Sequence, residues 1–307
     1  MSNRLNAIAP AKWIYFKLYL GQAIDRMDQL LVKLEQVVSQ MEAVESWFYI
    51  RYFDDQGVHI RLRVLPQARE EDLKKELNHR CATLLNALHD LLPSNYYPMV
   101  VPVGYDEAIE EGKVPGGHND VRIVSDVYEP ETDKFGGELG VKIAEAVFQV
   151  SSEIACNILS DEVQGFYSRK DLIPLLMSEC FNAFLSEGDA VVFWREYSFY
   201  WLGGNSPAAG DWRDKFFRKG EELAEQGVVV VPDETQLKES QLGYVKKWRD
   251  VLDSAAARYH ELRADLDANT EVLAFNFIHL MNNRLGIASL EEAYMATLLE
   301  QRARDRA

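Results

Sequence analysis

The segment from Trp47 to Pro66, WFYIRYFDDQGVHIRLRVLP, contains residues whose types and spacing could bind an anion. Side chains alternate between two faces along a strand, so His59, Arg61 and Arg63 are expected to share one face. The run before them is aromatic and β-branched, and Asp-Asp-Gln-Gly between the two runs is typical of a hairpin turn. Such a hairpin would present a compact positive cluster to one small anionic group, such as a carboxylate. The alternative interpretation is a solvated sheet face on which both arginines pair with nearby acidic residues.

A second candidate for chemistry is His279, in the helical pattern FIHLMNNRLGI. Asn283 follows one helical turn later and Arg284 is adjacent to it. A histidine titrates near neutral pH, so His279 is a candidate for proton transfer, with Asn283 or a backbone carbonyl fixing its ring. The alternative is a packing histidine that hydrogen bonds to an asparagine.

The charged turn from Tyr128 to Gly137 provides a third candidate, Lys134, which could reach a ligand held at the end of the sheet. Gly136 and Gly137 permit backbone conformations that other residues disfavour. A simple connection from strand to helix would explain these glycines equally well.

Composition excludes several classes of protein. The chain has 307 residues and a formal net charge of -16, which disfavours nucleic acid as the main partner because phosphate contacts need a basic surface. The cysteines, Cys81, Cys156 and Cys180, have no metal-ligand spacing and predict neither a disulfide framework nor a zinc site. We find no signal sequence and no apolar run of membrane-spanning length, so we expect a cytoplasmic protein with no membrane partner.

Hydrophobic periodicity predicts a sheet in the first part of the chain. Strands are expected over 13–20, 47–53, 59–65 and 121–128, and helices over 22–41 and 69–92. This order, β-α-β-β-α-β, is a split βαβ arrangement. Residues 93–119 show no clear period and are interpreted as a long surface excursion that could be functional.

The rest of the chain is predicted to be almost wholly helical. The expected helices cover 138–159, 171–185, 190–202, 212–226, 234–267, 270–285 and 289–302. The aromatic helix AVVFWREYSFYWL at 190–202 is interpreted as core packing rather than a binding box. The prediction is therefore an α+β protein with an α/β sheet lobe at 1–136 and a mainly helical lobe at 137–307. We expect the two lobes to form one compact unit with the site between them.

Four motifs appear in an order that is typical of one family. They are W-x-Y-x-K-L-Y at 13–19, FYIRYFDDxGxHIRLR at 48–63, YEPExxKFGG at 128–137 and IHxxNNRLGI at 278–287. The chain resembles the carboxy-terminal glutamate-elimination domain of class I lantibiotic dehydratases, which is also found as the stand-alone thiopeptide-type bacteriocin biosynthesis protein. The usual arginine before the Gly-Gly pair is Lys134 here, and 93–119 departs from the compact elimination domain.

The resemblance implies one of two reactions in the biosynthesis of ribosomal peptide natural products. An elimination enzyme removes glutamate from a glutamylated Ser or Thr of a precursor peptide, leaving dehydroalanine or dehydrobutyrine. A pyridine synthase joins two dehydroalanines in a formal [4+2] cycloaddition and expels the leader peptide. A third possibility, of a different class, is a non-catalytic subunit that binds the precursor peptide.

The elimination reading assigns catalytic roles to His279, Arg61 and Arg63 and substrate-binding roles to Arg51, His59, Lys134, Asn283 and Arg284. Neither enzymatic reading calls for a metal or an organic cofactor. The expected partners are a precursor peptide with leader and core and, for elimination, a separate tRNA-dependent glutamylating enzyme. No direct nucleic-acid partner is expected, and a homodimer is possible.

Overall fold

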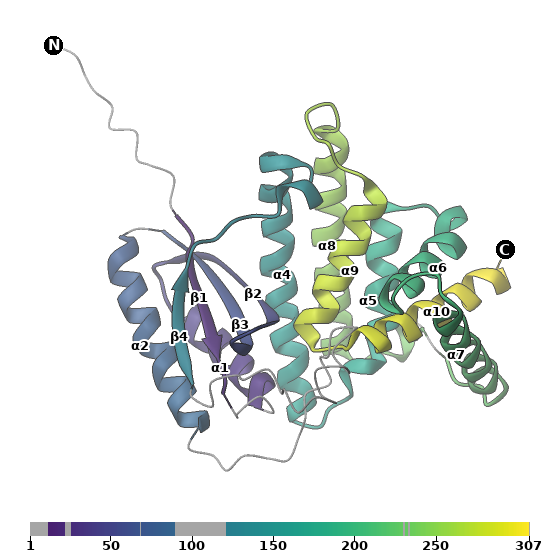
Figure 1. The fold of residues 1–307 in the computed structure, drawn as a ribbon, viewed down its shortest axis with the longest axis horizontal. Helices are drawn as coiled ribbons and strands as arrows, with labels where there is room; N and C mark the ends of the chain where they lie inside the picture. Colours follow the sequence, from purple (N-terminus) through teal and green to yellow (C-terminus); the bar gives the residue numbers. More distant parts are fainter. Residues whose placement is uncertain are drawn as a thin grey trace.

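The structure is a computed structural model that describes residues 12–21, 26–67, 69–89, 121–229, 231–232 and 234–306. The described chain is mixed α/β and mostly helical, with a small antiparallel sheet (Figure 1). The predicted surface excursion from Pro93 to Asn119 lies outside the described residues. None of the described helices combines the length and apolar character that crossing a membrane requires.

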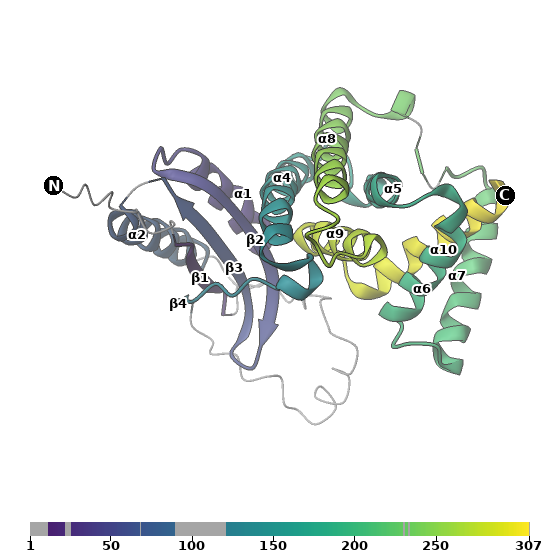
Figure 2. The same cartoon turned by 90° about the horizontal axis from the view of Figure 1, so that it is seen from above.

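Four strands form the sheet in the order β2-β3-β1-β4, and all neighbouring pairs are antiparallel. The strands are β1 (Ile14–Tyr19), β2 (Val44–Asp54), β3 (Gly57–Pro66) and β4 (Arg122–Asp126). Two helices, α1 (Met27–Ser39) and α2 (Glu70–His89), pack on one face of this sheet (Figures 1 and 2). Alternation along β3 turns Ile60, Leu62 and Val64 toward these helices, where they are buried.

The other face of the sheet carries the polar residues of β3. Arg63 pairs with Tyr15 and Phe48, Arg61 with Lys17 and Ile50, and His59 with Tyr19 and Tyr52 across the neighbouring strands. The side chains opposite one another in these pairs lie on the same face. Aromatic and cationic side chains therefore share one surface of the sheet.

Helices make up the rest of the described structure, to the right of the sheet in Figure 1. They are α4 (Gly137–Val163), α5 (Ile173–Phe184), α6 (Ala190–Trp201), α7 (Pro207–Glu225), α8 (Glu239–Glu261), α9 (Thr270–Leu285) and α10 (Ser289–Arg306). The 3-10 turn η2 (Thr132–Lys134) precedes α4, and η3 (Arg169–Asp171), η4 (Glu187–Asp189) and η5 (Glu234–Gln236) lie between helices. Helices α4 and α9 both pack against β2 and so join the helices to the sheet.

The predicted helix over 234–267 is longer than the observed one. Residues 234–236 form η5, and α8 begins after Lys238, whose backbone N–H donates to the Gln241 side chain at 2.8 Å. This capping interaction satisfies a donor that the first turn of a helix leaves free. The start of α8 is therefore fixed by a cap that periodicity does not reveal.

The turn between α9 and α10 determines how these helices meet. Gly286 adopts a left-handed conformation with φ of 75°, and Ile287 N–H donates to the Asn282 carbonyl at 3.0 Å. This is the common glycine-terminated end of a helix. A Cβ at Gly286 would lie 2.8 Å from Nη1 of Arg51, so a larger residue would also displace that guanidinium. The tight turn brings the start of α10 beside the last turns of α9.

Candidate functional site

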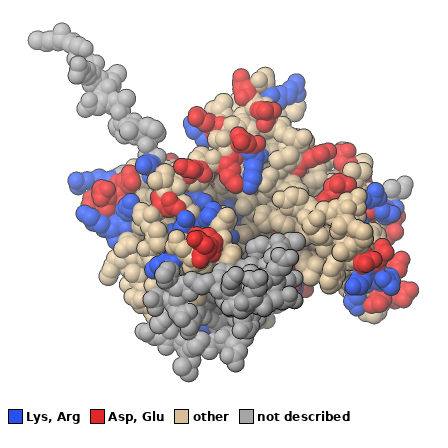
Figure 3. Space-filling view, viewed as in Figure 1, with Lys and Arg blue, Asp and Glu red and all other residues tan. Residues whose placement is uncertain are grey.

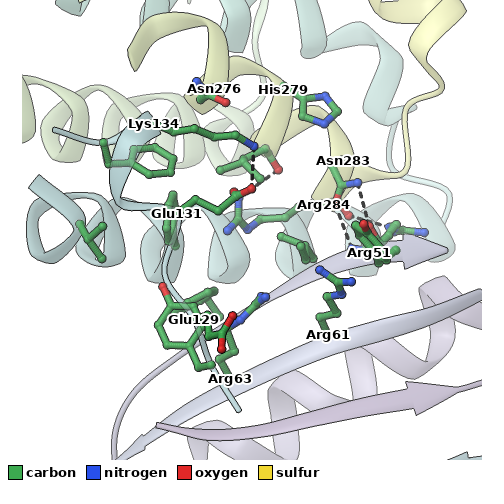
Figure 4. Close-up of a pocket in the computed structure, with 18 residues that line it drawn as sticks. Arg51, Arg61, Arg63, Glu129, Glu131, Lys134, Asn276, His279, Asn283 and Arg284 are labelled. Carbon is green, nitrogen blue, oxygen red and sulfur yellow. Dashed lines mark hydrogen bonds and ion pairs between the residues drawn. The ribbon is translucent and has the colours of Figure 1, made fainter. Parts of the chain in front are cut away.

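A pocket of about 370 Å³ lies between the open face of the sheet and helices α4 and α9. Its polar and charged lining residues are Arg51, Tyr52, Arg61, Arg63, Tyr128, Glu129, Glu131, Lys134, Asn276, His279, Asn283 and Arg284. Figure 4 shows Arg61 and Arg63 rising from the sheet on one side, with Asn276 and His279 on α9 opposite them. The structure thus brings together the arginines and the histidine that the sequence singles out.

Arg61 and Arg63 are held by aromatic rings rather than by carboxylates. The Arg61 guanidinium carbon lies 3.2 Å from the centre of the Tyr52 ring. That of Arg63 lies 4.7 Å, 5.3 Å and 5.0 Å from the ring centres of Tyr15, Phe48 and Tyr128. In both arginines the buried Nε has no hydrogen-bond partner among the described residues. Burial lowers the pKa of Arg63, because it removes water from the charged form.

Arg284 is a third cation at this pocket, and its side chain is buried. Its Nε donates to Ser152 Oγ at 3.0 Å and its Nη1 to the Leu280 carbonyl at 3.0 Å. Its Nη2 has no partner among the described residues. Burial lowers the pKa of Arg284 to about 9, and the nearby charge of Arg63 acts in the same direction. Three guanidinium groups therefore keep unused donors at one pocket, an arrangement that suits a bound anion.

His279 lies across the pocket from Arg61 and Arg63. Its Nδ1 is 3.0 Å from Oε1 of Glu292, and its ring centre is 4.4 Å from that of Trp201. The prediction that Asn283 or a backbone carbonyl fixes this ring is wrong. Asn283 instead accepts from the Arg51 backbone N–H at 2.9 Å and donates to the Arg51 carbonyl at 3.0 Å. The Asn283 amide therefore pairs with the backbone N–H and carbonyl of Arg51 at the outer edge of β2, where a further strand would otherwise pair.

Arg51 and His59 have other interactions. The Arg51 guanidinium donates to Asp28 at 2.7 Å and to the Arg284 carbonyl at 3.0 Å, so protein acceptors already use much of its capacity. His59 is not among the residues that line the pocket. It is buried between the rings of Tyr19 and Tyr52, and burial lowers its pKa. Arg51 is therefore already paired and His59 lies outside the pocket lining, so both differ from the unpaired cations Arg61, Arg63 and Arg284.

Lys134 lies at the exposed rim of the pocket. Its ammonium is 2.7 Å from Oε1 of Glu131, and both side chains are about half exposed or more. Glu129 lies on the same rim. The rim therefore mixes both signs of charge, whereas the buried wall at the sheet is cationic.

Neither Glu292 nor Trp201 is marked as a site residue by the sequence pattern. Trp201 ends the aromatic helix that was assigned to core packing; Phe193, Trp194 and Tyr197 of that helix are indeed buried. Glu292 lies in the first turn of α10, where an acidic residue is ordinary and carries no signal of its own. Only its burial and its neighbours mark it out.

Comparisons with known proteins place the chain in a family. The family described as "Lantibiotic biosynthesis dehydratase C-term" matches residues 13–303. No curated protein sequence gives a significant match.

Three solved structures share the fold. The tRNA-dependent lantibiotic dehydratase MibB from Microbispora sp. 107891 is 18% identical with a TM-score of 0.59, and the match covers 97% of this chain but 29% of MibB. The pyridine synthase TbtD from thiomuracin biosynthesis is 19% identical with a TM-score of 0.66, covering 96% of this chain and 98% of TbtD. TsrL is 14% identical with a TM-score of 0.53, covering 96% of this chain and 94% of TsrL. The chain thus spans under a third of MibB and nearly all of the other two.

At these identities the solved structures establish the fold, whereas the family match extends over nearly the whole sequence. The four motifs, which include the pocket residues Arg61, Arg63, Lys134 and His279, all lie within the matched range. The chain belongs to the family of lantibiotic biosynthesis dehydratase C-terminal domains.

Proposed function

We propose that this protein eliminates glutamate from glutamylated Ser or Thr residues of a precursor peptide, leaving dehydroalanine or dehydrobutyrine. The observation that carries the proposal is the placement of Arg61, Arg63 and Arg284 on one pocket with His279 opposite. None of these arginines is in a salt bridge with a carboxylate among the described residues. A substrate that brings its own carboxylate would supply the missing partner.

The reaction needs one base and one stabilised leaving group. The base removes the α-proton of the esterified residue, and the released electron pair forms the Cα–Cβ double bond. The Cβ–O bond breaks as that double bond forms, and glutamate leaves with the bonding electron pair as a carboxylate. In this proposal Nε2 of His279 takes the proton, while Arg61 and Arg63 stabilise the negative charge of the departing glutamate.

The charges around the pocket also fit a glutamyl ester as the substrate. Such an ester keeps one free carboxylate and one ammonium group. The walls of the pocket offer the guanidinium groups of Arg61 and Arg63 from the sheet and of Arg284 from α9, whereas Glu129 and Glu131 lie on the rim. In this proposal the carboxylate enters toward the wall and the ammonium stays near the rim, where water also solvates it.

The test uses a synthetic precursor peptide that carries a glutamylated serine. We expect release of free glutamate and formation of dehydroalanine, both measured by mass spectrometry. His279→Ala should lose this activity. His260→Ala is the matched control, because His260 lies on α8, contacts Arg263 and does not line the pocket. An ester that stays intact with wild-type protein would contradict the proposal.

The comparison with TbtD supports a second candidate, a pyridine synthase. The match with TbtD covers 96% of this chain and 98% of TbtD, so the two chains align over nearly their whole lengths. A precursor that already contains two dehydroalanines separates the candidates. Formation of a six-membered nitrogen ring with loss of the leader peptide would favour the synthase, whereas glutamate release from the ester favours elimination.

A further inference from the structure

Glu292 is a buried carboxylate that contacts the pocket histidine from behind. Its side chain is 1% exposed and is not part of the pocket lining. Oε1 lies 3.0 Å from Nδ1 of His279. Oε2 accepts hydrogen bonds from Nδ2 of Asn282 at 3.2 Å and from the Tyr197 hydroxyl. Three groups, two from α9 and one from α6, thus converge on one carboxylate of α10.

These contacts determine which nitrogen of a neutral His279 carries the proton. The Tyr197 hydroxyl and the Asn282 amide are donors here, so Glu292 is surrounded by donors and acts as the acceptor. The Nδ1 atom must then carry hydrogen in order to donate to Oε1. The remaining nitrogen, Nε2, is left with a lone pair.

The ring is also held in place by packing. Trp201 lies against the imidazole with 4.4 Å between ring centres and an interplanar angle of 33°. The His279 side chain remains 31% exposed, on the side that lines the pocket. The indole and the buried carboxylate therefore fix two sides of the imidazole and leave the pocket side accessible.

We propose that Glu292 is a positioning residue that holds His279 in the Nδ1–H form, with Nε2 available as a base toward the pocket. The carboxylate also stabilises the imidazolium that forms when Nε2 accepts a proton, as in other carboxylate–histidine pairs. The catalytic use of this pair depends on the proposed elimination, but the position of the proton is a property of the free protein. The charged groups that share the pocket with the imidazole are Arg51, Arg61, Arg63, Arg284, Lys134, Glu129 and Glu131.

The direct test is nitrogen NMR of protein with ¹⁵N-labelled histidine, recorded at a pH where His279 is neutral. Loss of one signal set in His279→Gln assigns the resonances. We expect His279 of the wild type to be protonated on Nδ1 and unprotonated on Nε2. In Glu292→Gln the single amide oxygen must serve three donors, so we expect a mixture of both forms. The Nε2–H form in the wild type would overturn the proposal.

A kinetic measurement on the glutamylated peptide tests the consequence. Glu292→Gln should lower kcat by roughly 100-fold or more, the scale of general-base catalysis, while KM changes by less than about threefold. A wild-type kcat in this variant would overturn the positioning role. The matched control is Glu291→Gln, which removes the neighbouring carboxylate that binds Lys170. It should keep both the wild-type spectrum and the wild-type kcat.

Two further results keep this inference separate from the proposed function. If wild-type protein shows the Nδ1–H form but releases no glutamate, the elimination proposal fails and the Glu292–His279 contact stands. If Glu292→Gln does not fold, Tyr197→Phe provides a second variant, because it removes one donor and keeps the carboxylate. It should retain the Nδ1–H form, and a mixture of forms in this folded variant would overturn the assignment to Glu292.

Discussion

The arginines at the pocket differ in whether other groups of the protein accept hydrogen bonds from their guanidinium groups. Arg51 donates to Asp28 and to a backbone carbonyl, so its charge has a structural partner. Arg61 and Arg63 lie against aromatic rings, which attract a cation but accept no full hydrogen bond from it. We therefore expect Arg61 and Arg63, whose donors remain unused, to contribute more to anion binding than Arg51 does.

Arg61 provides the first prediction. Arg61→Ala should weaken transition-state binding by about 1.5 to 3 kcal/mol, the range for a hydrogen bond to a charged group, or roughly 10- to 150-fold in kcat/KM. The measurement is glutamate release from the glutamylated peptide. Arg122→Ala is the control, because Arg122 lies over Tyr19 on the same sheet, outside the pocket lining. A change below twofold for Arg61→Ala would indicate a solvated face.

Arg284 provides a second prediction, because its charge is buried without a carboxylate. Replacing an unpaired buried charge by an apolar side chain of similar length removes a desolvation penalty. Arg284→Met should therefore raise the free energy of unfolding by about 1 kcal/mol in the absence of substrate, while lowering activity. Urea unfolding measures the first effect. A decrease of about 2 kcal/mol or more in the free energy of unfolding would mean that the hydrogen bonds of Arg284 to Ser152 and Leu280 outweigh the desolvation penalty of its charge.

At the scale of elements, polar contacts join the sheet to the helices around the pocket. Asp28 on α1 pairs with Arg51 on β2 and with Arg169 on η3. Arg169 also donates to the Leu285 carbonyl at the end of α9. Arg51 lines the pocket, whereas Asp28 and Arg169 connect the elements around it without lining it.

The cluster predicts a pH-dependent effect of Asp28→Asn. Burial raises the pKa of Asp28, but Arg51 and Arg169 outweigh it and lower the pKa below its ordinary value of 3.8. The charged form is thus favoured by folding. Its contribution is fully present above pH 3.8 and is lost as pH falls through the lower folded pKa.

We therefore expect Asp28→Asn to destabilise the fold by about 2 to 3 kcal/mol at pH 7, less than for a fully buried pair. The difference from wild type should shrink below pH 3.8. Urea unfolding at pH 7, 5 and 3 measures it. Asp72→Asn is the control, since its pair with Arg69 is exposed and should change stability by under about 0.5 kcal/mol. An equal loss at all three pH values would contradict the argument.

At the scale of the whole molecule, the pocket is a local exception to an acidic protein. The formal net charge is -16, and acidic and basic side chains are interspersed over the face drawn in Figure 3. Long-range attraction of an anion is therefore weak, and binding must come from close contacts inside the pocket.

Free glutamate, the proposed leaving group, should bind and stabilise the folded protein. A ligand at 100 times its Kd contributes about 2.7 kcal/mol, so Tm should rise with glutamate concentration. Glutamine is the matched ligand without the side-chain carboxylate and should give a smaller rise. Arg61→Ala should reduce the difference between the two. Equal shifts from glutamate and glutamine would contradict recognition of the side-chain carboxylate.

Local features of this molecule can be predicted from its amino-acid sequence. Alternation placed Arg61 and Arg63 on one face of β3, and helical spacing placed His279 and Arg284 on α9. Strand alternation and helical repeat follow from backbone geometry within a few residues, so a sequence pattern is enough to read them. The existence of most strands and helices was predictable for the same reason, whereas the start of α8 depended on a side-chain cap.

The side-chain contacts between different helices and strands depend on the three-dimensional packing. It directed Asn283 onto the Arg51 backbone instead of the His279 ring, and it supplied Glu292 from the next helix and Trp201 from α6. It also enclosed His59 between tyrosines, outside the pocket, although its strand face matches that of Arg61. These partners depend on how helices and strands pack and on the turn at Gly286. Neither the packing nor the turn produces a periodic residue pattern from which the contacts could be predicted.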